Sequence, residues 1–148
     1  MTIKKRWLIF VGITFGVIII VAAALFWRPL ELNTVLAREF EGEIATILIS
    51  EHNPGVRHDY EISDSRQIDA VIEYLDDISL RRTIIRPEVF RAGLHEDYHL
   101  TLVNQDGEIL RLWLIGDYVE VGFEKVYSAF EPEDFQALHA IIADFPRK

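Results

Sequence analysis

The chain has no cysteine, and its eight glycines are scattered among 148 residues. Without cysteine there is no disulfide framework, no thiolate metal site and no cysteine nucleophile. The glycines form no phosphate-binding loop, and no serine has the flanking glycines of a nucleophile elbow. Positive charge is also scarce. The net charge of −9 argues against nucleic acid as a partner.

Apolar residues are abundant, and they form one long run near the N-terminus. Residues 7–27 carry no charge, and these 21 residues would make a helix of about 31 Å, close to the hydrocarbon thickness of a bilayer. Trp7 and Trp27 stand at the two ends, where indole rings favour the lipid headgroup zone. We therefore predict a single transmembrane helix within residues 1–28, with the lipid bilayer as its partner.

The flanking charges predict the orientation of this helix. Lys4, Lys5 and Arg6 precede the apolar run and only Arg28 follows closely, which favours a cytoplasmic N-terminus and an extracytoplasmic C-terminal domain at the cell membrane. The alternative is a signal peptide cleaved at the alanines 22–24. Because the apolar run continues to Trp27, we favour the retained anchor.

The remainder of the chain divides into a connector, residues 29–40, and an acidic domain, residues 41–148. All 24 acidic but only 11 of the 15 basic residues follow Arg28, so the exported part carries −13. Strand-like patterns cover residues 44–50, 58–62, 82–85, 97–103, 108–115 and 118–121. Asp64 is expected to cap a helix that ends near Ser79, and another helix follows Pro132. The order predicts an α+β fold, an antiparallel sheet with two helices packed on one face.

The aromatic pattern of the second half resembles modules of unknown function on small membrane-anchored proteins of Gram-positive bacteria. The resemblance covers roughly residues 41–145 and is carried by Tyr98, Asp106-Gly107, residues 118–121, Val126-Tyr127, Phe135 and Leu138. It implies an exported accessory domain with no catalytic residues to carry over. The chain departs from the lipoprotein members because it has no cysteine lipobox, and the transmembrane helix would take its place.

One enzyme motif is present. His95, Glu96 and His99 read H-E-x-x-H, which binds zinc when a helix places both histidines on one face. Alternation from Asp97 onward predicts a strand instead, on which residues four apart are roughly 13 Å from each other. A zinc-dependent hydrolase at His95 and His99 is therefore only an alternative. We expect no cofactor and no catalytic residue.

Two other groups of residues are candidates for binding a partner. Four arginines lie within eleven residues of an acidic domain: Arg81, Arg82, Arg86 and Arg91. They would dock an anionic partner, or they balance the acidic helix before them, which we favour. Trp113 and Tyr118 would form a recognition surface if they lie on the open sheet face, although we favour a partly buried position in the core for Trp113.

These observations predict a non-catalytic, membrane-anchored extracytoplasmic accessory domain. Its expected partner is another protein of the membrane or cell envelope. A small-ligand sensor or inhibitor domain is the alternative, and it would use the same open sheet face.

Overall fold

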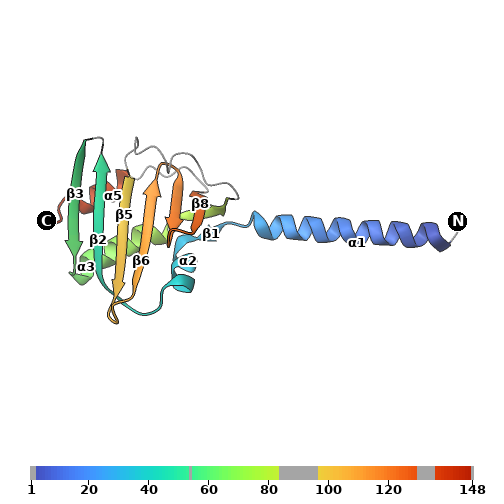
Figure 1. The fold of residues 1–148 in the computed structure, drawn as a ribbon, viewed down its shortest axis with the longest axis horizontal. Coiled ribbons are helices and arrows are strands. Elements are labelled where there is room, and N and C mark those ends of the chain that lie inside the picture. Colours follow the sequence, from blue (N-terminus) through green and yellow to red (C-terminus); the bar gives the residue numbers. More distant parts are fainter. Residues whose placement is uncertain (1–2, 54, 84–96, 130–135, 148) are drawn as a thin grey trace.

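The computed structural model describes residues 3–53, 55–83, 97–129 and 136–147. These residues form four helices and one antiparallel sheet of eight strands (Figure 1). The α+β class with an antiparallel sheet is the one that the alternating patterns predicted. The strands are β1 (Leu30–Glu31), β2 (Ile44–Asn53), β3 (Val56–Ile62), β4 (Ser79–Arg82), β5 (Asp97–Asn104), β6 (Ile109–Ile115), β7 (Tyr118–Val121) and β8 (Lys125–Ala129). Their order in the sheet is β1-β4-β8-β7-β6-β5-β2-β3.

Helix α1 (Ile3–Phe26) extends away from the sheet as a long, separate rod (Figure 1). Most of its described large apolar side chains are exposed, Phe10 to 71% and Ile20 to 68%. No helix within the described part of the chain has the length and apolarity that a membrane crossing requires.

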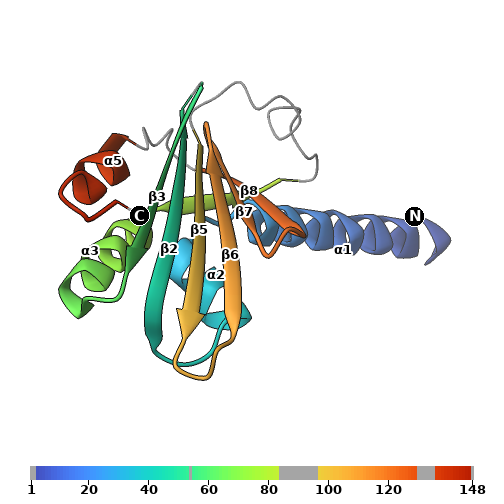
Figure 2. The ribbon, with the colours of Figure 1, turned by 60° about the vertical axis from the view of Figure 1, so that its left-hand side comes forward.

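Three helices contribute to one hydrophobic core on a single side of the sheet: α2 (Leu32–Glu39), α3 (Ser65–Asp76) and α5 (Gln136–Ile142) (Figure 2). The expectation was two helices on this face. The additional one, α2, lies in the segment 29–40 that we expected to be a connector. Leu32, Val35 and Leu36 of α2 are buried because its apolar stripe recurs at helical spacing.

Local sequence signals predicted α3 well at its start and less well at its end. The Asp64 carboxylate accepts hydrogen bonds from the backbone N–H groups of Arg66 and Gln67, as a helix cap does. Ile68, Val71 and Leu75 face the core. The helix ends at Asp76 rather than near Ser79, because Ser79 already begins β4. That strand runs over residues 79–82 instead of the expected 82–85, and residues 84–96 lie outside the described part of the chain.

The strands alternate between the core and the opposite side of the sheet, which we call the outer face. On β5, Tyr98, Leu100 and Leu102 are buried in the core, so Asp97, His99 and Thr101 point to the outer face. On β6, Leu110, Leu112 and Leu114 likewise point to the core. The outer face is therefore the place where polar and aromatic side chains of several strands meet.

Candidate functional site

A row of polar and aromatic residues crosses the outer face from strand to strand. The antiparallel register pairs Asp59 with Ser50, Ser50 with His99, His99 with Trp113, and Trp113 with Glu120. Directly paired residues of an antiparallel sheet point to the same face. Five strands, β3, β2, β5, β6 and β7, thus each contribute one side chain to this row, although the residues are up to 70 positions apart in the sequence.

A shallow cavity of about 340 Å³ lies over the middle of this row. Its lining combines two aromatic side chains with charged and titratable groups: Arg57, His99, Arg111, Trp113, Glu120 and Phe123. The Arg111 guanidinium lies 5.5 Å from the centroid of the Phe123 ring, a cation–π contact at the rim. Such a mixture of apolar surface and a few polar groups is typical of ligand-binding cavities.

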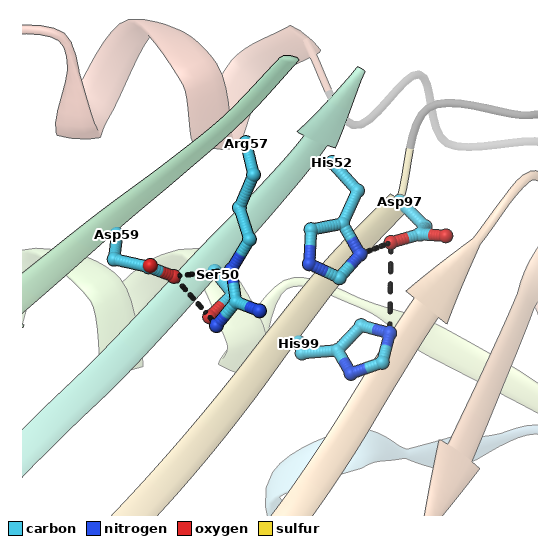
Figure 3. Close-up of polar contacts among 6 residues, drawn as sticks. All are labelled: Ser50, His52, Arg57, Asp59, Asp97 and His99. Carbon is cyan, nitrogen blue, oxygen red and sulfur yellow. Dashed lines mark hydrogen bonds and ion pairs between the residues drawn. The ribbon is translucent and has the colours of Figure 1, made fainter. Parts of the chain in front are cut away.

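One end of the row is held by a hydrogen-bonded group on β2 and β3 (Figure 3). Asp59 Oδ1 accepts hydrogen bonds from Ser50 Oγ at 2.6 Å and from Arg57 Nε at 2.9 Å. Arg57 Nη2 donates to Ser50 Oγ at 3.2 Å. The Ser50 hydrogen bond, with help from Arg57, holds the pKa of the Asp59 carboxyl below its ordinary value. Asp59 is therefore ionised at neutral pH and orients Arg57 beside the cavity.

Beside the row, two histidines surround a buried carboxylate where β2 ends and β5 begins (Figure 3). Asp97 Oδ1 is 2.9 Å from His52 Nδ1 and 3.6 Å from His99 Nε2. The His99 ring is also 4.6 Å from the Trp113 ring, between centroids. Burial lowers the pKa of His99 more than the neighbouring Asp97 charge raises it, so the imidazole is neutral near pH 7.

The structure places Trp113 on the outer face and not in the core. Leu112 and Leu114 occupy the core positions on either side of it, and because successive strand residues alternate, Trp113 must point the other way. Its side chain is half-buried next to His99. The core position that we favoured for Trp113 was therefore wrong, and a recognition role for the open face stays a prediction. Tyr118 points to the same face, opposite Ile115.

The described part of the arginine cluster does not form one surface. Arg81 and Arg82 are both exposed on β4, but as consecutive strand residues they point to opposite faces of the sheet. Arg82 lines a second cavity, of about 520 Å³, with Arg28 and Arg38 where α1 meets the domain. Arg86 and Arg91 lie outside the described residues.

The zinc-protease motif is also described only in part. His95 and Glu96 lie outside the described residues, whereas His99 is on β5. The segment from Asp97 is thus a strand, as its alternation predicted. Among the described residues, the histidine that comes close to His99 is His52 of β2, whose ring centroid is 4.8 Å from that of His99. No local motif signals this pair, because 46 residues separate the two in the sequence.

Sequence reasoning also missed a buried carboxylate on the core side of β2. Glu51 is fully buried and receives hydrogen bonds from Tyr60 Oη at 3.2 Å and Tyr98 Oη at 3.5 Å. His139 of α5 approaches it at 2.6 Å, from Nδ1 to Oε1. Burial, and then the Glu51 charge, raises the pKa of Tyr60. Because these contacts join β2, β3, β5 and α5, the cluster holds α5 on the sheet.

No protein-family model, no curated protein and no solved structure matches this chain.

Proposed function

We propose that this protein is a single-pass membrane protein whose extracytoplasmic α+β domain binds another protein of the membrane or cell envelope through the outer face of its sheet. The observation that carries the proposal is the half-buried Trp113 beside a cavity of about 340 Å³ on the face turned away from α2, α3 and α5. Tryptophan, tyrosine and arginine dominate the binding energy of protein interfaces. The proposed role is binding and not catalysis.

Two features of the N-terminal region support the anchor. The uncharged run of residues 7–27 belongs almost entirely to α1, and its apolar side chains are exposed to a degree that water does not favour. Trp7 and Trp27, at the two ends of the run, are 70% and 65% exposed. A bilayer would cover this surface and receive the indole rings at its two interfaces. The three basic residues before Trp7 support a cytoplasmic N-terminus.

The charge of the outer face supports a partner with both apolar and charged groups. Arg57 and Arg111 bring positive charge to the cavity rim in a domain whose overall charge is strongly negative. Phe123 and Trp113 together offer aromatic surface in the same cavity. A partner side chain that is aromatic or carboxylate would meet a complementary group here.

The volume of the cavity favours a second candidate function. A space of about 340 Å³ with two arginines and a buried Glu120 is large enough for a small polar ligand. In this alternative the domain is a sensor or inhibitor, and the same residues select the ligand.

The first experiment compares two variants of the full-length protein in a mild detergent. Each is recovered by a C-terminal tag, and the co-purifying proteins are identified and quantified by mass spectrometry. We expect a stoichiometric partner with the wild type, and its loss with Trp113→Ala. Ile109→Ala is the matched control, because Ile109 is an exposed residue of the same strand and face outside the cavity lining.

The result separates the two candidate functions once far-ultraviolet circular dichroism shows that both variants are folded. A partner lost with Trp113→Ala and kept with Ile109→Ala supports the protein-binding function. If both variants keep the partner, the interface does not depend on Trp113. If the wild type recovers no partner, the protein-binding proposal fails and the small-ligand alternative is the one to pursue.

A further inference from the structure

Three side chains of metal-binding type converge on the outer face at the junction of β2 and β5 (Figure 3). His52 and Asp97 are paired across the two strands, and His99 follows Asp97 by two residues, so all three point to the same face. One ligand atom of each lies within 4.8 Å of those of the other two. Because the positions are fixed by paired strands, the arrangement does not depend on a loop.

Three polar atoms of this cluster are buried without a hydrogen-bond partner in the described part of the chain: His52 Nε2, Asp97 Oδ1 and His99 Nε2. The 2.9 Å approach of Asp97 Oδ1 to His52 Nδ1 likewise lacks hydrogen-bond geometry. A carboxylate with 6% exposure that has no hydrogen bond at Oδ1 is costly in free energy. A cation between the three atoms would provide the missing partner.

The distances fit the coordination of a small transition-metal ion. Zinc binds histidine nitrogen and carboxylate oxygen at about 2.0–2.2 Å, and tetrahedral ligand atoms are then about 3.3 Å apart. The two distances at Asp97, 2.9 and 3.6 Å, lie on either side of this value. The His52 imidazole need only turn toward His99, which its partly exposed side chain permits.

We propose that His52, Asp97 and His99 form a binding site for a divalent transition-metal ion of the Zn²⁺ type. Imidazole and carboxylate are the ligands that such ions take in a chain without cysteine. Trp113, packed on the His99 ring, restricts the orientation of that ligand. Three protein ligands leave a fourth position for water or a bound group. The proposal is for metal binding alone and is independent of the partner proposed above.

The test is a calorimetric titration of the full-length protein with Zn²⁺ in a mild detergent. The protein carries a tag without histidine and is first stripped of metal by a chelator, and excess Mg²⁺ occupies diffuse acidic sites. We expect one Zn²⁺ per chain and a higher melting temperature of the zinc-loaded protein. His52→Ala and Asp97→Asn should each weaken zinc affinity by at least about 10- to 100-fold.

His58→Ala is the matched control, because His58 lies on β3 and outside the cluster. Its affinity for zinc should equal that of the wild type. The melting temperature of each metal-free variant reports folding, and His52→Gln replaces His52→Ala if the latter does not fold. Absence of stoichiometric binding overturns the proposal, and so does binding that survives both His52→Ala and Asp97→Asn. Binding lost only with His95→Ala would assign the metal to the H-E-x-x-H motif instead.

Discussion

At the scale of single residues, two carboxylates of the sheet, Glu51 and Asp59, lie in different environments. On the core side, Glu51 is fully buried and is compensated by hydroxyl groups of Tyr60 and Tyr98 and by His139. On the outer face, Asp59 is partly exposed and is compensated by Ser50 and Arg57. A buried charge that loses a partner cannot turn to water, whereas an exposed one can. The two carboxylates therefore predict different responses to mutation.

Tyr60→Phe removes one hydrogen bond from the buried Glu51 carboxylate. We expect it to lower the free energy of unfolding by about 1–3 kcal/mol, the cost of leaving a buried acceptor short of a donor. Tyr127→Phe removes the hydroxyl oxygen of a tyrosine on β8, which is not adjacent to β2 in the sheet, and serves as the control. Urea unfolding of the two variants measures the difference. Equal loss in both would show that the Tyr60 hydroxyl does not matter to Glu51.

Asp59→Asn should change how stability depends on pH. The pKa of Asp59 is below its ordinary value of 3.8 in the folded protein, so folding favours the ionised form. This stabilisation is fully present above about pH 5 and is lost as pH falls through the folded pKa. The wild type should thus exceed Asp59→Asn in unfolding free energy at pH 7 and lose that advantage at acidic pH.

The matched control for Asp59 is Asp69→Asn, which removes a carboxylate from an exposed position of α3. Chemical unfolding at several pH values measures both variants. A difference between wild type and Asp59→Asn that stays constant with pH would contradict the assignment.

At the scale of secondary-structure elements, a local signal determines where α3 starts and the tertiary fold determines where it ends. The Asp64 cap fixes the start of the helix through two backbone N–H groups, and this was readable from the sequence. The end of α3 depends on β4, which begins at Ser79 because Ser79 and Leu80 pair with β1, and Leu80 to Arg82 with β8. Pairing with distant strands leaves no local mark, so the end of the helix was misplaced.

Asp64→Ala should lower the free energy of unfolding by about 1 kcal/mol, because the two backbone N–H groups lose their acceptor. Asp69→Ala is the control within the same helix, where an exposed side chain should contribute less than about 0.5 kcal/mol. Thermal or urea unfolding compares the two. An equally small effect at Asp64 would mean that water replaces the cap.

At the scale of the whole molecule, α1 and the domain after Arg28 favour different solvents. The domain after Arg28 carries −13 and buries its apolar side chains against α2, α3 and α5, whereas α1 exposes its own. In water, an exposed apolar helix of this length would associate with other molecules. In the proposed topology, α1 lies in the bilayer and the acidic domain lies in water, so each part has a solvent that suits its surface.

Ile19→Arg places a charge near the middle of α1 and should reduce membrane association of the full-length protein. A central arginine costs about 2.5–3.5 kcal/mol in membrane insertion. Val56→Arg adds the same charge at the exposed start of β3 and should leave membrane association unchanged. Alkaline carbonate extraction of membranes measures both. Complete extraction of the wild type would contradict the anchor, and an intact mass that lacks residues 1–24 would show cleavage instead.

The sequence by itself determined the features that depend on neighbouring residues. The length of an uncharged apolar run predicted the N-terminal helix. Periodicity predicted the strands β5 and β6 and the apolar face of α3, and a capping residue predicted where α3 starts. These features follow from side-chain spacing and from hydrogen bonds within a few residues. The α+β class could be read from their order.

Only the tertiary structure decided which residues meet. Strand pairing brought His52 to Asp97 and His99, and placed Ser50, His99, Trp113 and Glu120 in one row, because register depends on partners far away in the sequence. Burial of Glu51 and the outward position of Trp113 were decided in the same way, since a strand pattern tells that two faces differ but not which one the helices cover. The candidate site is for this reason a property of the sheet and not of any single segment.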